Sequence, residues 1–397
     1  MTPLVLSAFT AVNALGRGIA SMLDALTTAR SGLKRLTFED VPIETYTGEV
    51  AGLSDLPVCT RLAEFDCRNN RLAELTLRQD GFAERVAQAR EKYGARRIAV
   101  ILGTSTSGIL DTEHAYRQRD AQTGALPPTF LFATTHNLYA STDFVRRYLG
   151  LEGPAAMIST ACSSSAKVFA SASRLIAQGL CDAAVVGGVD SLCRNTLYGF
   201  ASLDLVSREP CRPCDGQRSG ISIGEAAGFA LLERPENAPT HTGVALLGYG
   251  ESSDAYHMSS PHPEGEGAVL AMRRSLASAG LDPAQIDYIN MHGTASQAND
   301  SMEDKAISAV FGTNTPASST KGWTGHALGA AGITEAVIAA LSIQHAFMPG
   351  CLNTRAVDSS FTSKVILKNQ SGKVQRVLSN SFGFGGSNAS LIFGART

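Results

Sequence analysis

Short apolar runs alternate with helical patterns along this chain, and that alternation constrains its fold more than any other feature. In the first half the runs cover 97–103, 155–160, 182–189 and 227–233, and a small-residue helical stretch occupies 162–178. Apolar runs of this length are typical of buried strands, and a helix between two of them is typical of a parallel βαβ unit. The chain is therefore predicted to be an α/β protein with parallel strands.

A second series of the same kind follows the proline-containing stretch 234–243. Further elements are expected as strands at 244–249, 288–291 and 317–319, helices at 267–279, 301–311 and 327–345, and an antiparallel hairpin within 377–393. In both series a strand ending in Ser-Thr leads into a Gly/Ala/Ser-rich helix, before Cys162 in one and before His326 in the other. This internal symmetry predicts two related halves, 1–240 and 241–397.

Composition and charge narrow the functional classes. The 397 residues are 44% hydrophobic and carry a formal net charge of −2, which fits a folded globular chain and argues against general nucleic-acid binding. No uninterrupted apolar run reaches the roughly 18 residues of a membrane span, and the start of the chain lacks the pattern of a secretory signal. Eight irregularly spaced cysteines are typical of reduced thiols. A cytoplasmic protein with no membrane span is expected.

Cys162 is the first candidate for chemistry, because an apolar run delivers it to the start of a helix. The unpaired N–H groups and positive dipole of a helix N-terminus lower a cysteine pKa, and the thiolate is the nucleophile. A small buried core cysteine is the alternative for any single Cys. The motifs elsewhere in the chain favour the nucleophile.

Three further motifs lie far down the sequence, at 290–296 around His292, at 319–332 around Lys321 and His326, and in the Gly-rich segment 380–388. Together with the Cys162 motif, and in this order, they resemble the β-ketoacyl-[acyl carrier protein] synthases of the decarboxylating elongation type. The resemblance implies the duplicated thiolase fold, with five layers α/β/α/β/α. It also implies condensation of an acyl-enzyme thioester with malonyl-[acyl carrier protein], giving 3-oxoacyl-[acyl carrier protein], CO2 and free carrier protein.

The resemblance assigns a role to each motif residue. Cys162 would carry the acyl group as a thioester. His292 and His326, as neutral imidazoles, would bind the malonyl thioester carbonyl and stabilise the enolate left by decarboxylation. Lys321 would pair with Glu303, and its charge would oppose protonation of the nearby imidazoles.

Other residues are expected around the substrate. The backbone N–H of Phe382 would complete an oxyanion hole with that of the nucleophile, and the Phe382 ring would act as a gate. Thr294 and Ser296 match hydroxyls that contact the phosphopantetheine arm in relatives. Phe384 and Thr106 are expected to contact substrate, the small polar Thr106 admitting a less saturated chain. The alternative for Thr106 is a local hydrogen bond without a role in specificity.

Partners follow from the same resemblance. Arg208, with Arg68 and Arg71 as weaker candidates, would meet the acidic carrier protein at the rim of the site, the alternative being solvent-exposed cations without that task. Substrates arrive on the carrier's phosphopantetheine, so no cofactor or metal of the protein's own is expected. A dimer is expected, with either an identical subunit or a chain-length-factor-like homologue.

Several alternatives remain open at this level. The residue types of Cys162, His292 and His326 also suit zinc, and Cys211 and Cys214 have CxxC spacing, although no second pair completes a zinc set. Chain-length factors share the fold but lack the cysteine. An enzyme that only decarboxylates malonyl-carrier would carry the same residues.

The chain also departs from related patterns. Initiating synthases use Cys, His and Asn, and thiolases use a second Cys near the C-terminus, whereas no cysteine follows Cys351 here. Thr106 replaces a bulky apolar residue, Cys214 replaces an aromatic one, and 296–300 replaces Thr-Pro-x-Gly-Asp. These departures resemble ketosynthases of polyene-type secondary metabolism, such as aryl-polyene clusters, more than the housekeeping fatty acid enzymes.

Overall fold

A continuous mixed sheet runs through the computed structural model, which describes residues 1–238 and 243–396. In order across the sheet its strands are β13 (Lys364–Val365), β11 (Pro316–Ser318), β10 (Tyr288–Asn290), β15 (Arg376–Gly383), β16 (Ser387–Ala395), β9 (Val244–Ser253), β1 (Leu4–Asn13), β8 (Ala226–Glu233), β7 (Ala183–Asp190), β5 (Ile98–Gly103) and β6 (Ala155–Ile158). The two halves join where Leu4 and Val5 of β1 pair antiparallel with Leu246 and Ala245 of β9. The predicted boundary between 240 and 241 lies within 239–242, outside the described residues.

Strand direction agrees with the prediction in the outer part of each half. β5 pairs parallel with β6 and β7, β10 pairs parallel with β11 and β15, and the predicted C-terminal hairpin is β15 with β16. The parallel prediction is wrong for β8, which runs antiparallel to β7 along its whole length. The helix between them, α7 (Arg194–Ser202), packs against α4 (Ile109–Arg117) instead of crossing a face of the sheet, so the chain returns in the opposite direction.

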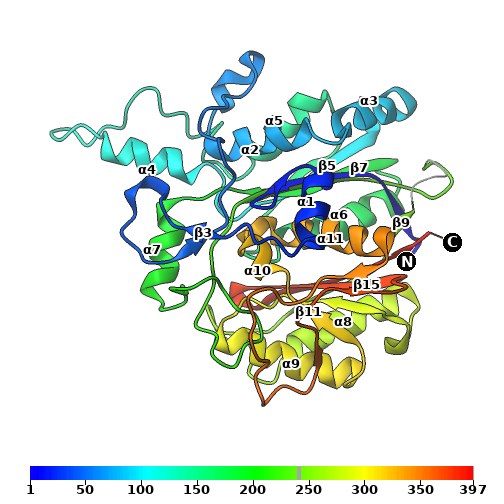
Figure 1. Cartoon of the computed structure of the whole chain (residues 1–397). Helices are drawn as coiled ribbons and strands as arrows, with labels where there is room; N and C mark the ends of the chain where they lie inside the picture. Colours follow the sequence, from blue (N-terminus) through cyan, green and yellow to red (C-terminus); the bar gives the residue numbers. More distant parts are fainter. Residues whose placement is uncertain (239–242, 397) are drawn as a thin grey trace.

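Helices cover both outer faces and fill the space between the halves, which gives the five predicted layers (Figure 1). The outer helices are α2 (Arg68–Leu77), α3 (Phe82–Tyr93) and α5 (Ala140–Leu149) on the N-terminal half, and α8 (Glu266–Ala279) and α9 (Gln297–Phe311) on the C-terminal half. Two helices, α6 (Ser164–Ala177) and α11 (Ala331–His345), pack against each other in the middle layer. They touch closely near their first turns, because a Cβ added at Gly332 would lie 2.6 Å from the backbone N of Ala166.

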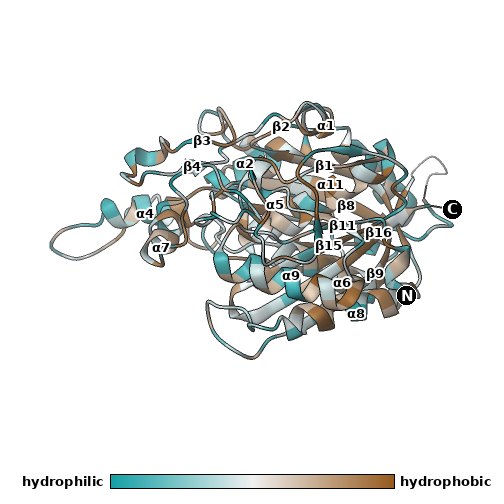
Figure 2. Ribbon diagram, turned by 60° about the horizontal axis from the view of Figure 1, so that its bottom comes forward, coloured by the Kyte–Doolittle hydropathy of each residue, from teal (hydrophilic) through white to brown (hydrophobic). Residues whose placement is uncertain are grey.

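The core follows the hydropathy of these elements. Strands β5, β7 and β8 are buried at every residue, and Figure 2 shows α11 among the apolar central strands while α4 and α9 carry polar colour. The stretch Leu328–His345 is long and apolar enough to cross a membrane by length and composition alone. It is 89% buried inside the fold, which is the position of a core helix between two sheets.

Candidate active site

Cys162 lies in a tight turn between β6 and α6. Ala161 has a φ of 51°, a left-handed conformation that is strained for a residue with a Cβ. Ser164 closes the turn, since its Oγ accepts the N–H of Thr160 (2.9 Å) and donates to the carbonyl of Ala161 (2.6 Å). α6 begins at Ser164, so the sulfur is held at a helix start as predicted, with the residue only 5% exposed.

Two histidines reach Cys162 from the other half of the chain. His326, in the turn between α10 (Lys321–Thr324) and α11, places its Nε2 3.1 Å from Cys162 Sγ. His292 lies two residues beyond β10, and its ring meets that of His326 edge to face, with centroids 5.3 Å apart. The structure therefore brings together the cysteine and both histidines that the motifs indicate.

Lys321 lies buried behind the histidines. Its Nζ donates to Glu335 and to the backbone carbonyl of His292, and it lies 3.3 Å from His292 Nδ1. The predicted pairing with Glu303 is wrong. Glu303 instead accepts the backbone N–H groups of His292 and Gly293, both at 2.8 Å, because α9 places its carboxylate against the loop that carries the histidine.

Glu335 is the residue that reasoning from sequence missed. It is the one charged side chain between Ala327 and Ile343 in the sequence, and it is 2% exposed. A buried carboxylate in an otherwise apolar helix needs a partner cation. A single charged residue in an otherwise apolar helix was therefore the sequence signal that could have identified Glu335.

The lysine fixes the protonation of His292. An ammonium group only donates, so His292 Nδ1 accepts from Lys321 and the ring proton lies on Nε2. Burial lowers the pKa of His292 well below its usual value, and the charge of Lys321 lowers it further. The same two causes lower the pKa of His326. Both rings are therefore neutral near pH 7.

The nucleophile behaves differently from the sequence prediction. Burial raises the pKa of Cys162 to about 11, and the nearby charge of Lys321 offsets only part of that rise. The predicted lowering by the helix N-terminus is wrong for the resting site, because the cost of desolvating the thiolate is larger. Cys162 rests as a thiol and needs a base, and His326 Nε2 is the neutral acceptor beside it.

Two phenylalanines of the Gly-rich segment line the cavity in different surroundings. The backbone N–H of Phe384, not that of Phe382, donates to the Cys162 sulfur. Phe382 is 5% exposed within β15, and its ring packs against His292 with centroids 5.9 Å apart, a buried position that does not favour the predicted gate. Phe384 is 36% exposed and rests against Phe200, with ring centroids 5.6 Å apart. Phe384 is therefore the phenylalanine of this segment whose backbone N–H lies beside the Cys162 sulfur and whose ring keeps exposed surface.

Comparison with known proteins agrees with this geometry. The N-terminal domain model of the β-ketoacyl synthases matches residues 2–238, and the C-terminal domain model matches residues 244–355. The chain belongs to the β-ketoacyl synthase family. The ketosynthase is thus a condensing acyltransferase of the 3-oxoacyl-[acyl-carrier-protein] synthase type, with the thiolase fold.

Individual relatives extend over most of the chain. A mitochondrial 3-oxoacyl-[acyl-carrier-protein] synthase of Arabidopsis thaliana is 33% identical, covering 96% of this chain and 91% of that protein. A 3-oxoacyl-[acyl-carrier-protein] synthase 2 of Rhizobium meliloti is 38% identical, covering 74% of this chain and 73% of that protein. A chain from the solved complex of a Xenorhabdus doucetiae ketosynthase with its chain length factor is 40% identical with a TM-score of 0.89, covering 100% of this chain and 98% of that one.

The cavity of the ketosynthase contains some of the predicted substrate contacts and not others. Thr294, Ser296 and Phe384 line the same cavity as Cys162 and both histidines, and the cavity together with the solvent at its open mouth takes up about 730 Å³. Thr106 does not line it. Its hydroxyl (2.8 Å) and its backbone N–H (2.9 Å) both donate to the Asp190 carboxylate. Thr106 thus has the structural hydrogen-bonding role of the alternative, but its partner is a side chain 84 residues away and not a local backbone group.

The three predicted carrier-binding arginines differ in exposure. Arg208 is exposed, as a docking cation must be. Arg68 is 6% exposed and paired with the buried Glu225 at 2.6 Å, so its predicted docking role is wrong. Arg71 is half-buried and paired with Asp66 at 2.7 Å. Arg71 thus keeps some exposed surface, and its docking role stays a prediction.

The ligand atoms of Cys162, His292 and His326 lie within 4.8 Å of one another, close enough to hold a metal ion. The Lys321 ammonium, 3.3 Å from His292 Nδ1, opposes a dication at that place. The CxxC pair joins no ligand cluster in the part of the chain that the structure describes. The charge of the lysine thus favours thiol chemistry over zinc in this ketosynthase.

Proposed function

We propose that Cys162 takes the acyl group from a carrier-protein thioester with His326 as its base. The observation that carries this assignment is the 3.1 Å contact between a buried thiol and a neutral imidazole nitrogen. As Cys162 Sγ attacks the thioester carbonyl, its proton passes to His326 Nε2 and then to the departing carrier thiolate. The backbone N–H of Phe384, which donates to the Cys162 sulfur in the resting site, is proposed to stabilise the oxyanion.

The second half of the reaction uses the same cavity. His292, with its proton on Nε2, donates to the malonyl thioester carbonyl while CO2 leaves, and the enolate that remains attacks the acyl carbonyl on Cys162. The thiolate of Cys162 departs and takes a proton from solvent water. The Nδ1 of His326 has no hydrogen-bond partner among the described residues, so this ring is able to change tautomer and act as a second donor. The acyl groups arrive as thioesters, and no further cofactor is required.

The experiment is a carrier-protein assay read by mass spectrometry. Wild type incubated with acyl-carrier and malonyl-carrier should give 3-oxoacyl-carrier, whereas His292→Ala should still load Cys162 but extend it about 100- to 1000-fold more slowly. Extension by His292→Ala at the wild-type rate would refute the role of His292. Release of acetyl-carrier without any 3-oxoacyl product in wild type would instead favour a malonyl-carrier decarboxylase.

The proposal includes two partners. The carrier protein would dock at the mouth of the cavity near the exposed Arg208. A second subunit would cover β6, an edge strand whose small and apolar side chains are half-exposed or exposed. The arm 118–139, which projects from the body after α4 (Figure 1), would extend the same interface with Leu131 and Phe132, which are 45% and 54% exposed.

The second subunit is proposed to be a chain-length-factor-like homologue, and the pathway a polyene-type secondary one. Two features support this. The chain is 40% identical to a chain from one ketosynthase–chain length factor complex and 27% identical to a chain from another, against 29–38% identity to 3-oxoacyl-[acyl-carrier-protein] synthases, so the first complex supports this choice. The departures at Cys214 and 296–300 point the same way. Co-expression with such a homologue, followed by native mass spectrometry, distinguishes a heterodimer from a homodimer.

A further inference from the structure

The segment that leads into α9 lines the cavity with polar groups that include both hydrogen-bond donors and hydrogen-bond acceptors. Thr294 Oγ1 and Ser296 Oγ lie 3.0 Å apart, and Asn299 lines the same cavity while remaining 9% exposed. One of the two hydroxyl protons is used between the hydroxyls themselves, and the other is available to a ligand. This wall therefore offers a hydroxyl donor close to an asparagine amide.

The orientation of the Asn299 amide is fixed from behind. Its Nδ2 donates to Asp300 Oδ1 at 3.1 Å, and Asp300 also accepts the backbone N–H groups of Cys214 (2.8 Å) and Ala295 (3.2 Å). If the Asn299 amide were turned the other way, its carbonyl oxygen would face the Asp300 carboxylate. Two acceptors cannot form a hydrogen bond with each other. Asn299 Oδ1 must point away from Asp300. Across the described ranges no donor reaches this oxygen, and it is not sealed from solvent.

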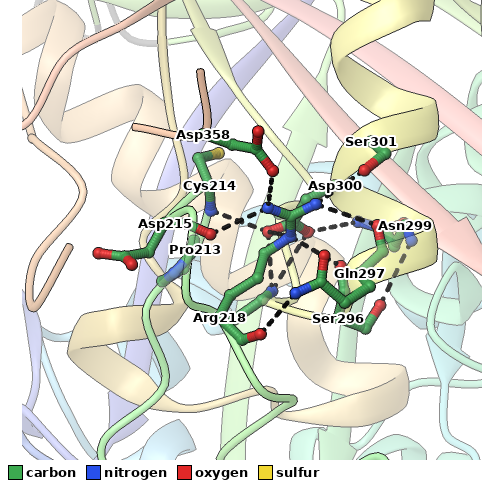
Figure 3. A network of polar contacts seen from close by, with 12 residues as sticks. Pro213, Cys214, Asp215, Arg218, Ser296, Gln297, Asn299, Asp300, Ser301 and Asp358 are labelled. Atoms are coloured by element: carbon green, nitrogen blue, oxygen red, sulfur yellow. Dashed lines mark hydrogen bonds and ion pairs between the residues drawn. The ribbon is translucent and has the colours of Figure 1, made fainter. Parts of the chain in front are cut away.

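Arg218 helps to hold the Asp300 carboxylate in place, so that the carboxylate cannot turn together with the Asn299 amide (Figure 3). Its side chain is fully buried, 3.8 Å from Asp300, and it donates to Asp358 Oδ2 and Ser301 Oγ, both at 2.7 Å. A further donation to the carbonyl of Gln297 (3.2 Å) ties it to the backbone of the cavity wall. The network thus holds the acceptor in place before any ligand arrives.

We propose that Asn299 is a specificity-determining residue that accepts an amide N–H of the phosphopantetheine arm, while the neighbouring hydroxyl pair donates to the carbonyl of that amide. A free acceptor beside a free donor matches a secondary amide, which offers one of each. The inference rests on the proposed function, because it assumes that the acyl group enters on a phosphopantetheine thioester. It adds a residue that selects for the arm rather than for the acyl chain.

The test compares acyl-pantetheine thioesters with analogues in which one amide N–H is replaced by an ester oxygen, using acylation of Cys162 followed by intact mass. Wild type should load the analogue at the contacted amide about 3- to 10-fold more slowly than the amide, the range for one neutral hydrogen bond. Asn299→Leu should lose this discrimination and load both compounds at the slower rate. Asn299→Ser, which leaves the site less crowded, should do the same.

The controls separate this inference from a folding defect and from the proposed function. Asn314→Leu, at an exposed asparagine outside the cavity, should discriminate like wild type. Equal slowing of amide and ester compounds by both Asn299 variants, or no discrimination by wild type, would overturn the role of Asn299. Loading of the Asn299 variants from an ethanethiol thioester, which has no amide, should match wild type. Failure of wild type to load from any thioester would overturn the proposed function and this inference with it.

Discussion

The charge state of Cys162 is decided by burial, by the neutral ring of His326 and by the charge of Lys321. Burial favours the neutral thiol, and the lysine is too far back to reverse that preference. The neutral histidine removes the need for a standing thiolate, because it takes the proton when the substrate carbonyl is attacked. The site thus stays unreactive until a thioester is bound.

Alkylation of Cys162 by iodoacetamide tests this charge state. With a pKa of about 11, the thiolate fraction and hence the rate should rise about tenfold per pH unit from pH 6 to pH 9 without a plateau. The rate is followed by intact mass, with Cys162→Ala giving the contribution of the other cysteines. A plateau below pH 8 would mean that the resting site holds a thiolate.

The buried pair of Lys321 and Glu335 gives a second prediction for single residues. Each residue is 2% exposed, so Lys321→Met or Glu335→Gln leaves a buried partner unpaired and should lower the free energy of unfolding by about 3–5 kcal/mol. The double variant should lose clearly less than the sum. Urea denaturation measures all three. A larger coupling between Lys321 and Glu303 would restore the pairing expected from sequence.

Secondary-structure elements were largely predictable, because their apolar periodicity reflects burial directly. The predicted strands at 97–103, 155–160 and 182–189 became β5, β6 and β7 with small shifts at their ends. The contacts that the elements make across the fold were not predictable in this way. Glu303 and Glu335 both lie on helices beside the site, and only the packing of α9 and α11 decides which of them meets Lys321.

Phe382, near the end of β15, and Phe384, in the turn that follows it, offer a matched pair of substitutions. Phe382→Ala should lower the free energy of unfolding by about 3–5 kcal/mol, because it empties a buried site beside His292. Phe384→Ala removes a partly exposed ring, so it should change stability by less than about 1 kcal/mol while altering the rate of acyl loading. Denaturant unfolding and intact-mass loading assays report both effects. A stability loss confined to Phe384→Ala would reverse the two roles.

At the scale of the whole molecule, the two halves depend on each other at the site. The N-terminal half supplies Cys162, and the C-terminal half supplies both histidines, Lys321 and Phe384. The four ordered motifs, through their resemblance to the ketosynthases, predicted this convergence, whereas the repeated Ser-Thr pattern before Cys162 and His326 predicted only two related halves. The sequence could not predict the antiparallel β8, the burial of Arg68 or the absence of Thr106 from the cavity wall, since each depends on packing between distant segments.

Assembly through β6 is the prediction for the whole molecule. Ala156→Lys places a charge on the exposed edge strand and should convert the dimer to monomer in light scattering coupled to size-exclusion chromatography. Ala284→Lys, at another exposed alanine, within η4 (Pro283–Gln285), is the matched control and should leave the dimer intact. A dimer that survives Ala156→Lys at micromolar concentration would move the interface elsewhere.

The central claim, that Cys162 holds the acyl group which the histidine pair then helps to extend, is tested most directly by a single-turnover transfer. The ketosynthase is loaded with an isotopically labelled acyl group, freed of excess donor, and mixed with malonyl-carrier and with a chain-length-factor-like partner where one is required. The label should appear first as an adduct on the Cys162 peptide, absent from Cys162→Ala, and should then move to the carrier as labelled 3-oxoacyl product. A label that never resides on Cys162, or that remains there while 3-oxoacyl-carrier forms, would contradict the account.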